Sequence, residues 1–259
     1  MLALPRPPIV TLTTDFGLTD SYVGEMKGVL LAGCPEVRIV DVTHGIPPQD
    51  VLAGGFAVER VLRAFPPGTV HVAVVDPGVG SDRRILRVDL HGQHVLCPDN
   101  GLITWAWRRL GGGVAHELTW RPPQSSATFH GREIFAPAAA MLASDDSSAP
   151  RLSGPTVEPI LLPLTPATDQ PSEAELIHID HFGNVTTNVP VEAISARPPR
   201  VIRVAQRSLG PVRRTYADVS EGEPLALIGS SGLLEIAVRN GNAAHALGLR
   251  VGDRLTIEY

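Results

Sequence analysis

The sequence predicts an α/β protein: an N-terminal, mainly parallel sheet with helices on both faces, followed by a smaller C-terminal antiparallel β-barrel. Three observations favour this class. Strand-like and helix-like apolar patterns alternate in the first part of the chain, short alternating runs broken by Gly, Asn and Pro fill the last part, and a Pro-, Ser- and Thr-rich stretch separates them. At 259 residues the chain can hold two domains. We expect an α/β domain over residues 1–148, a linker over 149–172 and a β-barrel domain over 173–259.

The N-terminal pattern is βαβαβ. An apolar β-rich run, PPIVTLTTDFG (7–17), stops at an acid and a glycine, and YVGEMKGVLLAGC (22–34) follows with helical spacing. EVRIVDVTHG (36–45), QDVLAGGFAVERVLRAF (49–65) and TVHVAVVDPGVG (69–80) then repeat strand, helix and strand. Strands alternating with helices predict parallel pairing, with both faces of the sheet covered.

The next segments predict a hairpin and two more helices. RRILRVDLHGQHVLCPDNG (83–101) has alternation on both sides of His91-Gly92, which predicts two antiparallel strands joined there. GLITWAWRRLGGG (101–113) and IFAPAAAMLAS (134–144) are helical in pattern, the first ended by three glycines. In the C-terminal part, the short alternating runs predict antiparallel strands. They are AELIHIDHFGNVTTNVP, RVIRVAQRSLGPVRRTY, EPLALIGSSGLLEIAVRNG and DRLTIEY.

Charge and composition limit the classes of binding partner that we expect. A net charge of -5 gives no electrostatic reason to expect nucleic acid or an anionic membrane, and no segment is apolar for the length that a bilayer requires. The N-terminus lacks the basic region and long apolar run of a signal peptide. Cys34 and Cys97 are too few for a disulfide framework, so we expect buried or semi-buried thiols in a reducing, cytoplasmic setting. The charge leaves small molecules and protein subunits as partners, and we expect a small-molecule substrate.

Three predicted parallel strands end in acids: Asp15, Asp41 and Asp76. Ligands of open parallel sheets bind beyond the carboxyl ends of the strands, so these acids are expected to face one crevice. Each of them alone could equally cap a helix or fix a turn. Three in succession favour a site.

Two histidines follow predicted strands. His44, with Asp41, stands before a proline-rich turn, where a structural role is favoured over ligand binding. His130 stands between a β-type run and a helix start, where side chains reach a cleft. Together Asp76, Arg83 and His130 could supply an anion, a fixed cation and a proton-transfer group, which makes water activation a plausible use.

The C-terminal part carries two polar turns. Asp180, Phe182 and Asn184 offer a carboxylate, an aromatic face and an amide, suited to a ligand with an ammonium group and a flat base. A polar β-turn with a core phenylalanine explains them equally well. The turn at Ser230 and Ser231 could present backbone amides and hydroxyls to a carboxylate. It lacks the lysine and the strand-loop-helix context of a phosphate loop.

These segments resemble a known family. TLTTDFGLTDSYVGEMKGVL, DVTHGIPPQDV, VVDPGVGSDRR, PDNGLIT, TFHGREIFAP, IDHFGNVTTN and GSSGLLEIAVRNGNAA stand in the order of the S-adenosylmethionine hydroxide adenosyltransferases. Those enzymes are the water-using relatives of the fluorinase and chlorinase. The resemblance spans both predicted domains. It implies hydrolysis of S-adenosyl-L-methionine to adenosine and L-methionine by attack of water or hydroxide on the ribose C5′, with neither metal nor cofactor.

The resemblance also implies roles for residues. The family's catalytic Asp-Arg-His set falls on Asp76, Arg83 and His130. The halogenases carry tyrosine where Asp76 stands and serine near Gly131, so both positions favour the hydrolase branch. Substrate-binding positions fall on Asp15 (ribose), Tyr22, Asp180 (methionine amine), Phe182 and Asn184 (adenine side), Ser230 (methionine carboxylate region), Glu235 and Val238. Where the fluorinase has a tryptophan and, after the serine, an arginine, this sequence has Gln49 and Ser231. The family is homotrimeric, with each active site at a subunit interface, between one subunit's first domain and a neighbour's barrel.

Two other functions stay open. A metal-dependent hydrolase could use the strand-end acids with His44 or His130, although no HxH or HExxH spacing is present. A nucleoside-binding sensor could keep the pocket without turnover. Survival of activity after chelation would set aside the first, and products in molar excess over protein would exclude the second.

Overall fold

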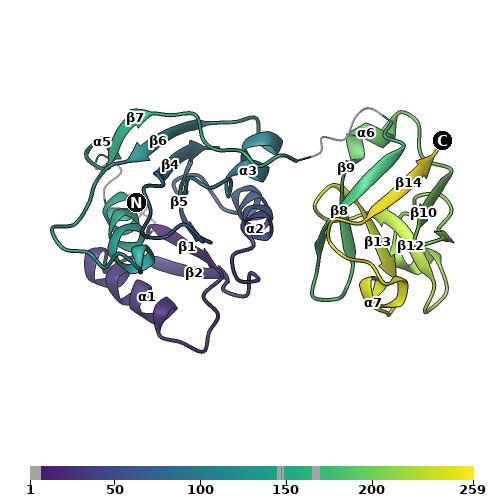
Figure 1. The fold of residues 1–259 in the computed structure, drawn as a ribbon, viewed down its shortest axis with the longest axis horizontal. Helices are drawn as coiled ribbons and strands as arrows, with labels where there is room; N and C mark the ends of the chain where they lie inside the picture. Colours follow the sequence, from purple (N-terminus) through teal and green to yellow (C-terminus); the bar gives the residue numbers. More distant parts are fainter. Residues whose placement is uncertain (1–6, 145–146, 148, 165–169) are drawn as a thin grey trace, which may run out of the picture. The chain divides into compact units, whose positions relative to one another are not determined.

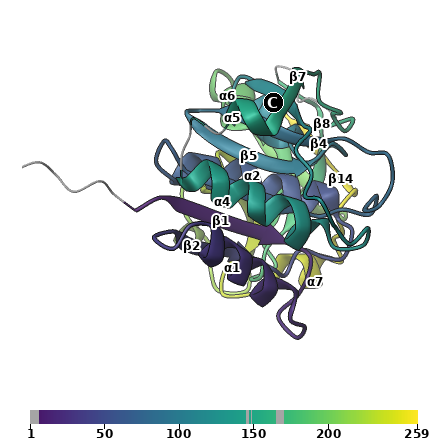
Figure 2. The same cartoon turned by 90° about the vertical axis from the view of Figure 1, so that its left-hand side faces the viewer.

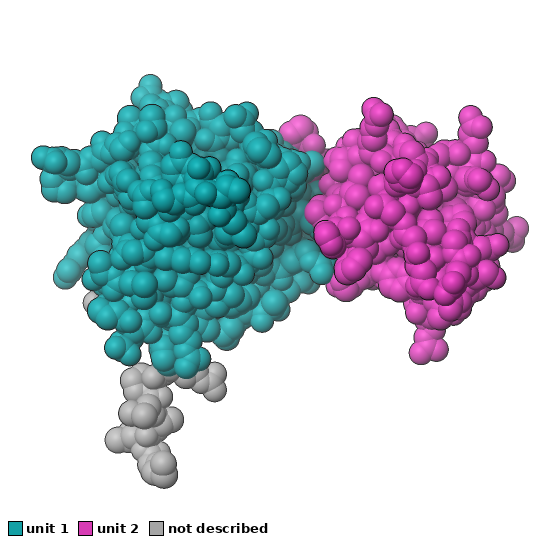
Figure 3. All heavy atoms as spheres, turned by 90° about the horizontal axis from the view of Figure 1, so that it is seen from below, with its two compact units in different colours: residues 1–162 teal, residues 163–259 magenta. Residues whose placement is uncertain are grey.

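The computed structural model describes residues 7–144, 147, 149–164 and 170–259. The chain divides into two compact units, residues 1–162 and 163–259, each of which is described by itself (Figure 3). No helix in the described ranges is long and apolar enough to cross a membrane.

The first unit is built on a seven-stranded mixed sheet. Its order is β2-β1-β3-β5-β4-β6-β7, and pairing is parallel from β2 to β5 and antiparallel through β4, β6 and β7 (Figure 1). The strands are β1 (Ile9–Thr14), β2 (Arg38–Thr43), β3 (Val70–Val74), β4 (Ile85–Leu90), β5 (Gln93–Pro98), β6 (Val114–Leu118) and β7 (Ser153–Thr156). Strand β3 is buried along its whole length, as expected for a parallel strand covered on both faces.

Helices cover both faces of this sheet, which confirms the predicted class (Figure 2). α1 (Tyr22–Gly33) and α4 (Ala136–Ser144) pack on one face, and α2 (Val51–Ala64) and α3 (Thr104–Arg109) on the other. α1 and α4 approach closely because small residues meet between them: a Cβ on Gly33 would lie 2.7 Å from Cβ of Ala140. α2 begins at Asp50, whose carboxylate accepts the backbone N–H of Ala53.

The predicted hairpin is confirmed. β4 and β5 pair in antiparallel register, and both turn residues, His91 and Gly92, have positive φ, as a two-residue hairpin of the type I′ kind requires.

Two strands of the first sheet were not predicted. β6 follows the three-glycine turn, and β7, at the edge of the sheet, contains Gly154 and Pro155 and shows no alternation. The segment expected as a linker, 149–172, thus begins with a short helix, α5 (Ala149–Leu152), and this edge strand. Further along, Ile160 N–H donates to the Asp99 carboxylate and Leu162 N–H to the Thr104 hydroxyl, which ties this segment to the first unit.

The second unit is a curled, antiparallel half-barrel, in agreement with the predicted β class. Its strands are β8 (Glu173–Ile179), β9 (Val185–Pro190), β10 (Val201–Val204), β11 (Arg207–Ser208), β12 (Pro224–Ile228), β13 (Leu233–Val238) and β14 (Arg254–Glu258), in the order β11-β10-β14-β8-β9-β13-β12. Its core is aliphatic, with Leu176, Ile202 and Leu234 fully buried. Two short helices, α6 (Val191–Ser195) and α7 (Ala243–Leu247), were not predicted; α7 is capped by the Asn242 side chain.

Candidate active site

A pocket of about 500 Å³ opens at the carboxyl ends of β1 and β3. Asp15 directly follows β1 and Asp76 follows β3, and both line the pocket. The two strands are parallel neighbours, so the loops that leave them emerge at one edge of the sheet. The other lining residues come from these loops, from the turn after β2 and from the segment before η1, a π-helical turn (Gly131–Phe135): Phe16, Tyr22, Pro48, Gln49, Val74, Pro77, Val79, Thr128, Phe129, His130 and Gly131.

Arg83 clamps the carboxylate of Asp76. Its Nε donates to Oδ1 at 2.6 Å and its Nη2 donates to Oδ2, so two parallel hydrogen bonds join the groups. The Asp76 side chain is 4% exposed and that of Arg83 9%. Two parallel hydrogen bonds from one planar guanidinium hold the carboxylate of Asp76 in a fixed direction.

The loop between these residues folds back so that position 83 reaches position 76. Val79 N–H donates to the Asp76 carbonyl, and the next turn is closed by Ser81, whose N–H and hydroxyl both donate to the carbonyl of Gly78. Gly80 has φ of 81°, and a Cβ there would lie 2.8 Å from the carbonyl oxygen of Ala127. Glycine is therefore required at this position, both for the left-handed backbone and for the close approach.

His130 completes the group. Arg83 Nη2 donates to His130 Nδ1 at 3.0 Å, and because a guanidinium can only donate, Nδ1 accepts and the proton of a neutral ring sits on Nε2. Burial and then the Arg83 charge lower the pKa of His130 below its ordinary value. The imidazole is therefore neutral at pH 7. The π-helical turn η1 begins immediately after it, as such turns often do at functional sites.

Three aromatic side chains also line the pocket. The rings of Phe16, Tyr22 and Phe129 meet edge to face, with centroids 5.1 to 5.9 Å apart. The guanidinium of Arg132 covers Phe129 at 5.1 Å. The lining thus combines this aromatic cluster with the polar groups of Asp76 and His130.

The expectation that Asp41 shares this crevice is wrong. Asp41 lies inside β2, paired with Leu12, and it does not line the pocket. Its carboxylate binds Lys27 at 2.6 Å and lies 3.1 Å from Nε2 of His44. These two partners lower the pKa of Asp41 against the opposing effect of its partial burial. The structural role favoured for His44 agrees with its burial beneath the loop that follows β1.

The sequence indicated no role for Asn100. Its Nδ2 donates to the carbonyl of Val75 at 2.9 Å, and its Oδ1 accepts the N–H of Leu102. Asn100 therefore fixes the backbone immediately before Asp76. Only the polar, turn-forming sequence PDNG at the end of a predicted strand could have signalled it.

In the second unit, Asp180, Phe182 and Asn184 share one turn after β8. Asp180 Oδ1 accepts the N–H groups of Phe182 and Asn184, and Oδ2 accepts Nδ2 of Asn184 at 3.1 Å. The reading of Phe182 as a core residue fails, because its side chain is 72% exposed. The turn thus presents an aromatic face and a fixed carboxylate at the surface of this unit.

The other predicted residues of this unit are placed differently. Ser230 is exposed in the turn between β12 and β13, Val238 is buried in the aliphatic core, and Glu235 is buried on β13. Glu235 Oε1 accepts the hydroxyl of Tyr216 at 2.8 Å. Burial, and then the Glu235 carboxylate, raise the pKa of Tyr216 to about 12, so its hydroxyl remains a donor. Sequence reasoning missed Tyr216.

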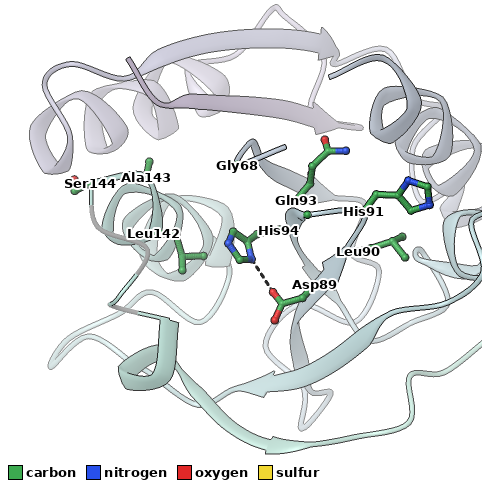
Figure 4. A pocket seen from close by; sticks show the side chains of 10 residues that line it. Gly68, Asp89, Leu90, His91, Gln93, His94, Leu142, Ala143 and Ser144 are labelled. Atoms are coloured by element: carbon green, nitrogen blue, oxygen red, sulfur yellow. Dashed lines mark hydrogen bonds and ion pairs between the residues drawn. The ribbon is translucent and has the colours of Figure 1, made fainter. Parts of the chain in front are cut away.

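A second hollow, of about 490 Å³, lies where β3 and β5 begin, away from the carboxyl-end pocket (Figure 4). Asp89 and His94 line it and bind each other at 2.6 Å, and Asp89 also pairs with Arg87. None of the predicted site residues lines it. Across the described residues, no group of three or more His, Cys, Asp or Glu side chains could hold a metal ion.

The first unit is an α/β unit with an Asp-Arg-His group at the carboxyl ends of its strands, and a curled antiparallel unit follows it in the chain. Family models for the SAM hydroxide adenosyltransferase N-terminal and C-terminal domains match residues 10–151 and 174–256, and the chain belongs to this family.

Individual proteins are also similar to this chain over almost its whole length. An (R)-S-adenosyl-L-methionine hydrolase of Salinispora arenicola is 41% identical, over 96% of this chain and 97% of its own. A fluorinase of Nocardia brasiliensis is 28% identical, over 98% and 97%. The crystal structure of an uncharacterized conserved protein from Thermotoga maritima has a TM-score of 0.87 and 33% identity, covering 96% of this chain and 99% of that one.

Proposed function

We propose that this chain hydrolyses S-adenosyl-L-methionine to adenosine and L-methionine by attack of an activated water on the ribose C5′, without a metal or cofactor. The observation that carries the proposal is the Arg83 clamp on Asp76, with His130 bound to the same guanidinium, in the wall of a pocket of about 500 Å³. The (R)-S-adenosyl-L-methionine hydrolase relative supports the same substrate and suggests the (R) epimer.

The chemistry needs little from the protein at the leaving group. A sulfonium leaves as a neutral thioether: the C5′–S electron pair goes to sulfur while water forms the C5′–O bond, and one water proton is released. No general acid is required, so the residues need only hold, orient and deprotonate the water. The positive charge on sulfur disappears as the C5′–S bond breaks. A poorly solvated pocket favours this step, because it stabilises the charged sulfonium less well than water does.

Asp76, Arg83 and His130 would share these three tasks. The Asp76 oxygens each keep a lone pair beyond the one that Arg83 uses, so the carboxylate can accept a hydrogen bond from water and take its proton. Arg83 holds the Asp76 carboxylate in a fixed direction. His130 carries its proton on Nε2, so this nitrogen would donate a hydrogen bond to the oxygen of the water or of the ribose. A protonated Nε2 cannot take the proton of the water, so it would not be the general base.

Substrate recognition is proposed for residues of both units. Asp15 would accept the ribose hydroxyls, and Tyr22 would form part of the aromatic cluster beside it. Asp180 would accept the methionine ammonium, while Phe182 and Asn184 would meet the adenine. Ser230, Glu235 and Val238 would lie on the methionine side, with Val238 acting from the core behind the surface.

We also propose a homotrimer in which the first unit of one copy and the second unit of another build each site. Exposed apolar side chains at the pocket edge support an interface there: Tyr22 is 46% exposed and Val79 39%. Two free, buried thiols, Cys34 and Cys97, are in keeping with a cytoplasmic setting.

The deciding experiment incubates the purified protein with S-adenosyl-L-methionine in ¹⁸O-water. We expect one ¹⁸O in the 5′ hydroxyl of adenosine and adenosine in large molar excess over protein. Product limited to one equivalent would favour the nucleoside-binding sensor. Loss of activity after chelation, restored by added metal, would favour the metal-dependent hydrolase.

A further inference from the structure

The loop after β2 holds the loop after β1 at three points. The carbonyl of His44 accepts the N–H of Gly17 at 2.8 Å, and Nδ1 of His44 meets the hydroxyl of Thr14 at 2.8 Å. The third contact is made by Gln49, whose N–H donates to Oδ2 of Asp15 at 2.8 Å. Asp15 is therefore flanked on both sides by residues bound to His44.

The hydrogen bonds around Thr14 run in one direction. Phe16 N–H donates to the Thr14 hydroxyl oxygen at 3.2 Å, which leaves the hydroxyl proton for Nδ1 of His44. A neutral His44 then carries its proton on Nε2, which lies 3.1 Å from the Asp41 carboxylate. Lys27 fixes the far side of Asp41 at 2.6 Å. Hydrogen bonds thus link His44 through Thr14 to the backbone of Phe16, and the ion pair of Lys27 and Asp41 lies beside the other ring nitrogen of His44.

We propose that His44, acting through Thr14, is a positioning residue that fixes the backbone of residues 15–17 and so directs Asp15 and Phe16 into the pocket. Asp15 and Phe16 line the pocket, whereas His44 and Thr14 do not. His44 is 4% exposed and Thr14 is fully buried. The inference rests on the proposed function, because it takes the adenosyl group as the ligand that Asp15 and Phe16 meet.

A matched control pair joins the same strand, β1, to β3. Thr11, also fully buried on β1, makes a hydrogen bond of 2.7 Å from its hydroxyl to Nδ1 of His71. His71 is a buried, neutral imidazole whose pKa burial lowers to about 4. This pair has the chemistry and burial of Thr14 and His44, but neither of its members lines the pocket. Thr11→Val therefore reports what losing a buried threonine hydroxyl on β1 does by itself.

The test compares Thr14→Val, Thr14→Ser and Thr11→Val in the full chain. Valine keeps the shape and removes the hydroxyl, whereas serine keeps the hydroxyl. For Thr14→Val we expect the KM for S-adenosyl-L-methionine to rise about tenfold, with kcat within about threefold of wild type, because ground-state and transition-state binding to the ribose are lost together. Thr14→Ser should restore KM to within about twofold. Thr11→Val should lower Tm by a similar amount and leave KM unchanged.

Amide hydrogen exchange gives a second readout that needs no turnover. In Thr14→Val the amides of residues 16 and 17 should exchange about tenfold faster than in wild type, and in Thr11→Val they should not. If Thr14→Val does not fold, His44→Asn takes its place. The asparagine carbonyl can still accept from Thr14 near the position of Nδ1, so His44→Asn should raise KM less than His44→Ala.

Two results would overturn the inference: wild-type KM and exchange in Thr14→Val, or the same rise in KM in Thr11→Val. Failure of the proposed function is distinguishable, because wild-type protein would then release no adenosine from S-adenosyl-L-methionine. The exchange comparison would still decide whether the Thr14–His44 pair holds the loop.

Discussion

Nη2 of Arg83 donates to Nδ1 of His130 at 3.0 Å while the same guanidinium holds the carboxylate of Asp76. One cation therefore fixes both the direction of an acid and the tautomer of an imidazole. Removing the cation disturbs two groups at once, and removing either partner leaves the other in place. This asymmetry determines what substitutions at the three positions should do.

Asp76→Asn keeps the shape of the side chain and removes its charge. The maximal rate should fall about 10²- to 10⁴-fold, the usual range for loss of a positioned acid or base, while affinity for S-adenosyl-L-methionine changes little. Steady-state kinetics measures the rate, and adenosine binding by calorimetry serves as the control. A near-normal rate would place water activation elsewhere in the pocket.

Arg83→Ala should produce a defect of similar size, because the carboxylate loses its partner and its direction. The double variant with Asp76→Asn should be far less impaired than the product of the two single effects, since both residues serve one nucleophile. A double-mutant cycle on kcat measures this coupling. Independent, multiplying losses would show that the two residues do separate work.

The pH dependence follows from His130, whose pKa is lowered below 6.5 by burial and by Arg83. Protonation at Nδ1 would remove the acceptor for Arg83 and add a second positive charge. Activity should therefore persist as the pH falls through 6.5 and decline only nearer the lowered pKa. A kcat/KM profile between about pH 5 and pH 9 checks this.

The pH dependence of the free energy of unfolding should also depend on His130. The unfolded chain binds the His130 proton at higher pH than the folded chain, so this residue's contribution to the free energy of unfolding decreases as the pH falls below 6.5. His130→Asn keeps an acceptor and cannot titrate. It should therefore remove the part of the acid limb that belongs to His130, and an unchanged profile would assign that limb to another group.

Gly80→Ala tests the loop that joins Asp76 to Arg83. The left-handed backbone should cost about 1–2 kcal/mol of stability, and the added Cβ would also press on the carbonyl of Ala127, three residues before His130. We expect kcat to fall about 10- to 100-fold, since small misplacements of reacting groups are costly. Gly111→Ala is the matched control, because φ there is 85° and nothing lies within 4 Å. Equal losses of rate in both variants would reject the role of the contact.

Periodicity predicted most of the first unit because its parallel strands and covering helices repeat strong, uninterrupted patterns. β7 escaped prediction because a short edge strand needs no apolar alternation and tolerates Gly154 and Pro155. Asp41 was misplaced because its strand continues to Thr43, and the pattern alone does not fix where a strand ends.

The sequence predicted which polar residues stand at the ends of strands. It did not predict which groups they bind. Asp76 and Arg83 are seven positions apart, and only the folded loop brings them together. Asn100 and Tyr216 act through a backbone carbonyl and a buried carboxylate, contacts that leave no periodic trace in the sequence. The roles assigned to the site residues remain predictions.

Cys97 is fully buried on β5, and desolvation, reinforced by the Asp99 charge, raises the pKa of its thiol, with Asp76 and Arg83 close enough to influence it too. Thiolates, and not thiols, attack electrophilic carbon. A sulfonium is an alkylating agent, so a site that binds one could also modify its own side chains. Burial keeps the Cys97 sulfur protonated and out of contact with solvent, so the packing that supports β5 also shields this thiol from alkylation.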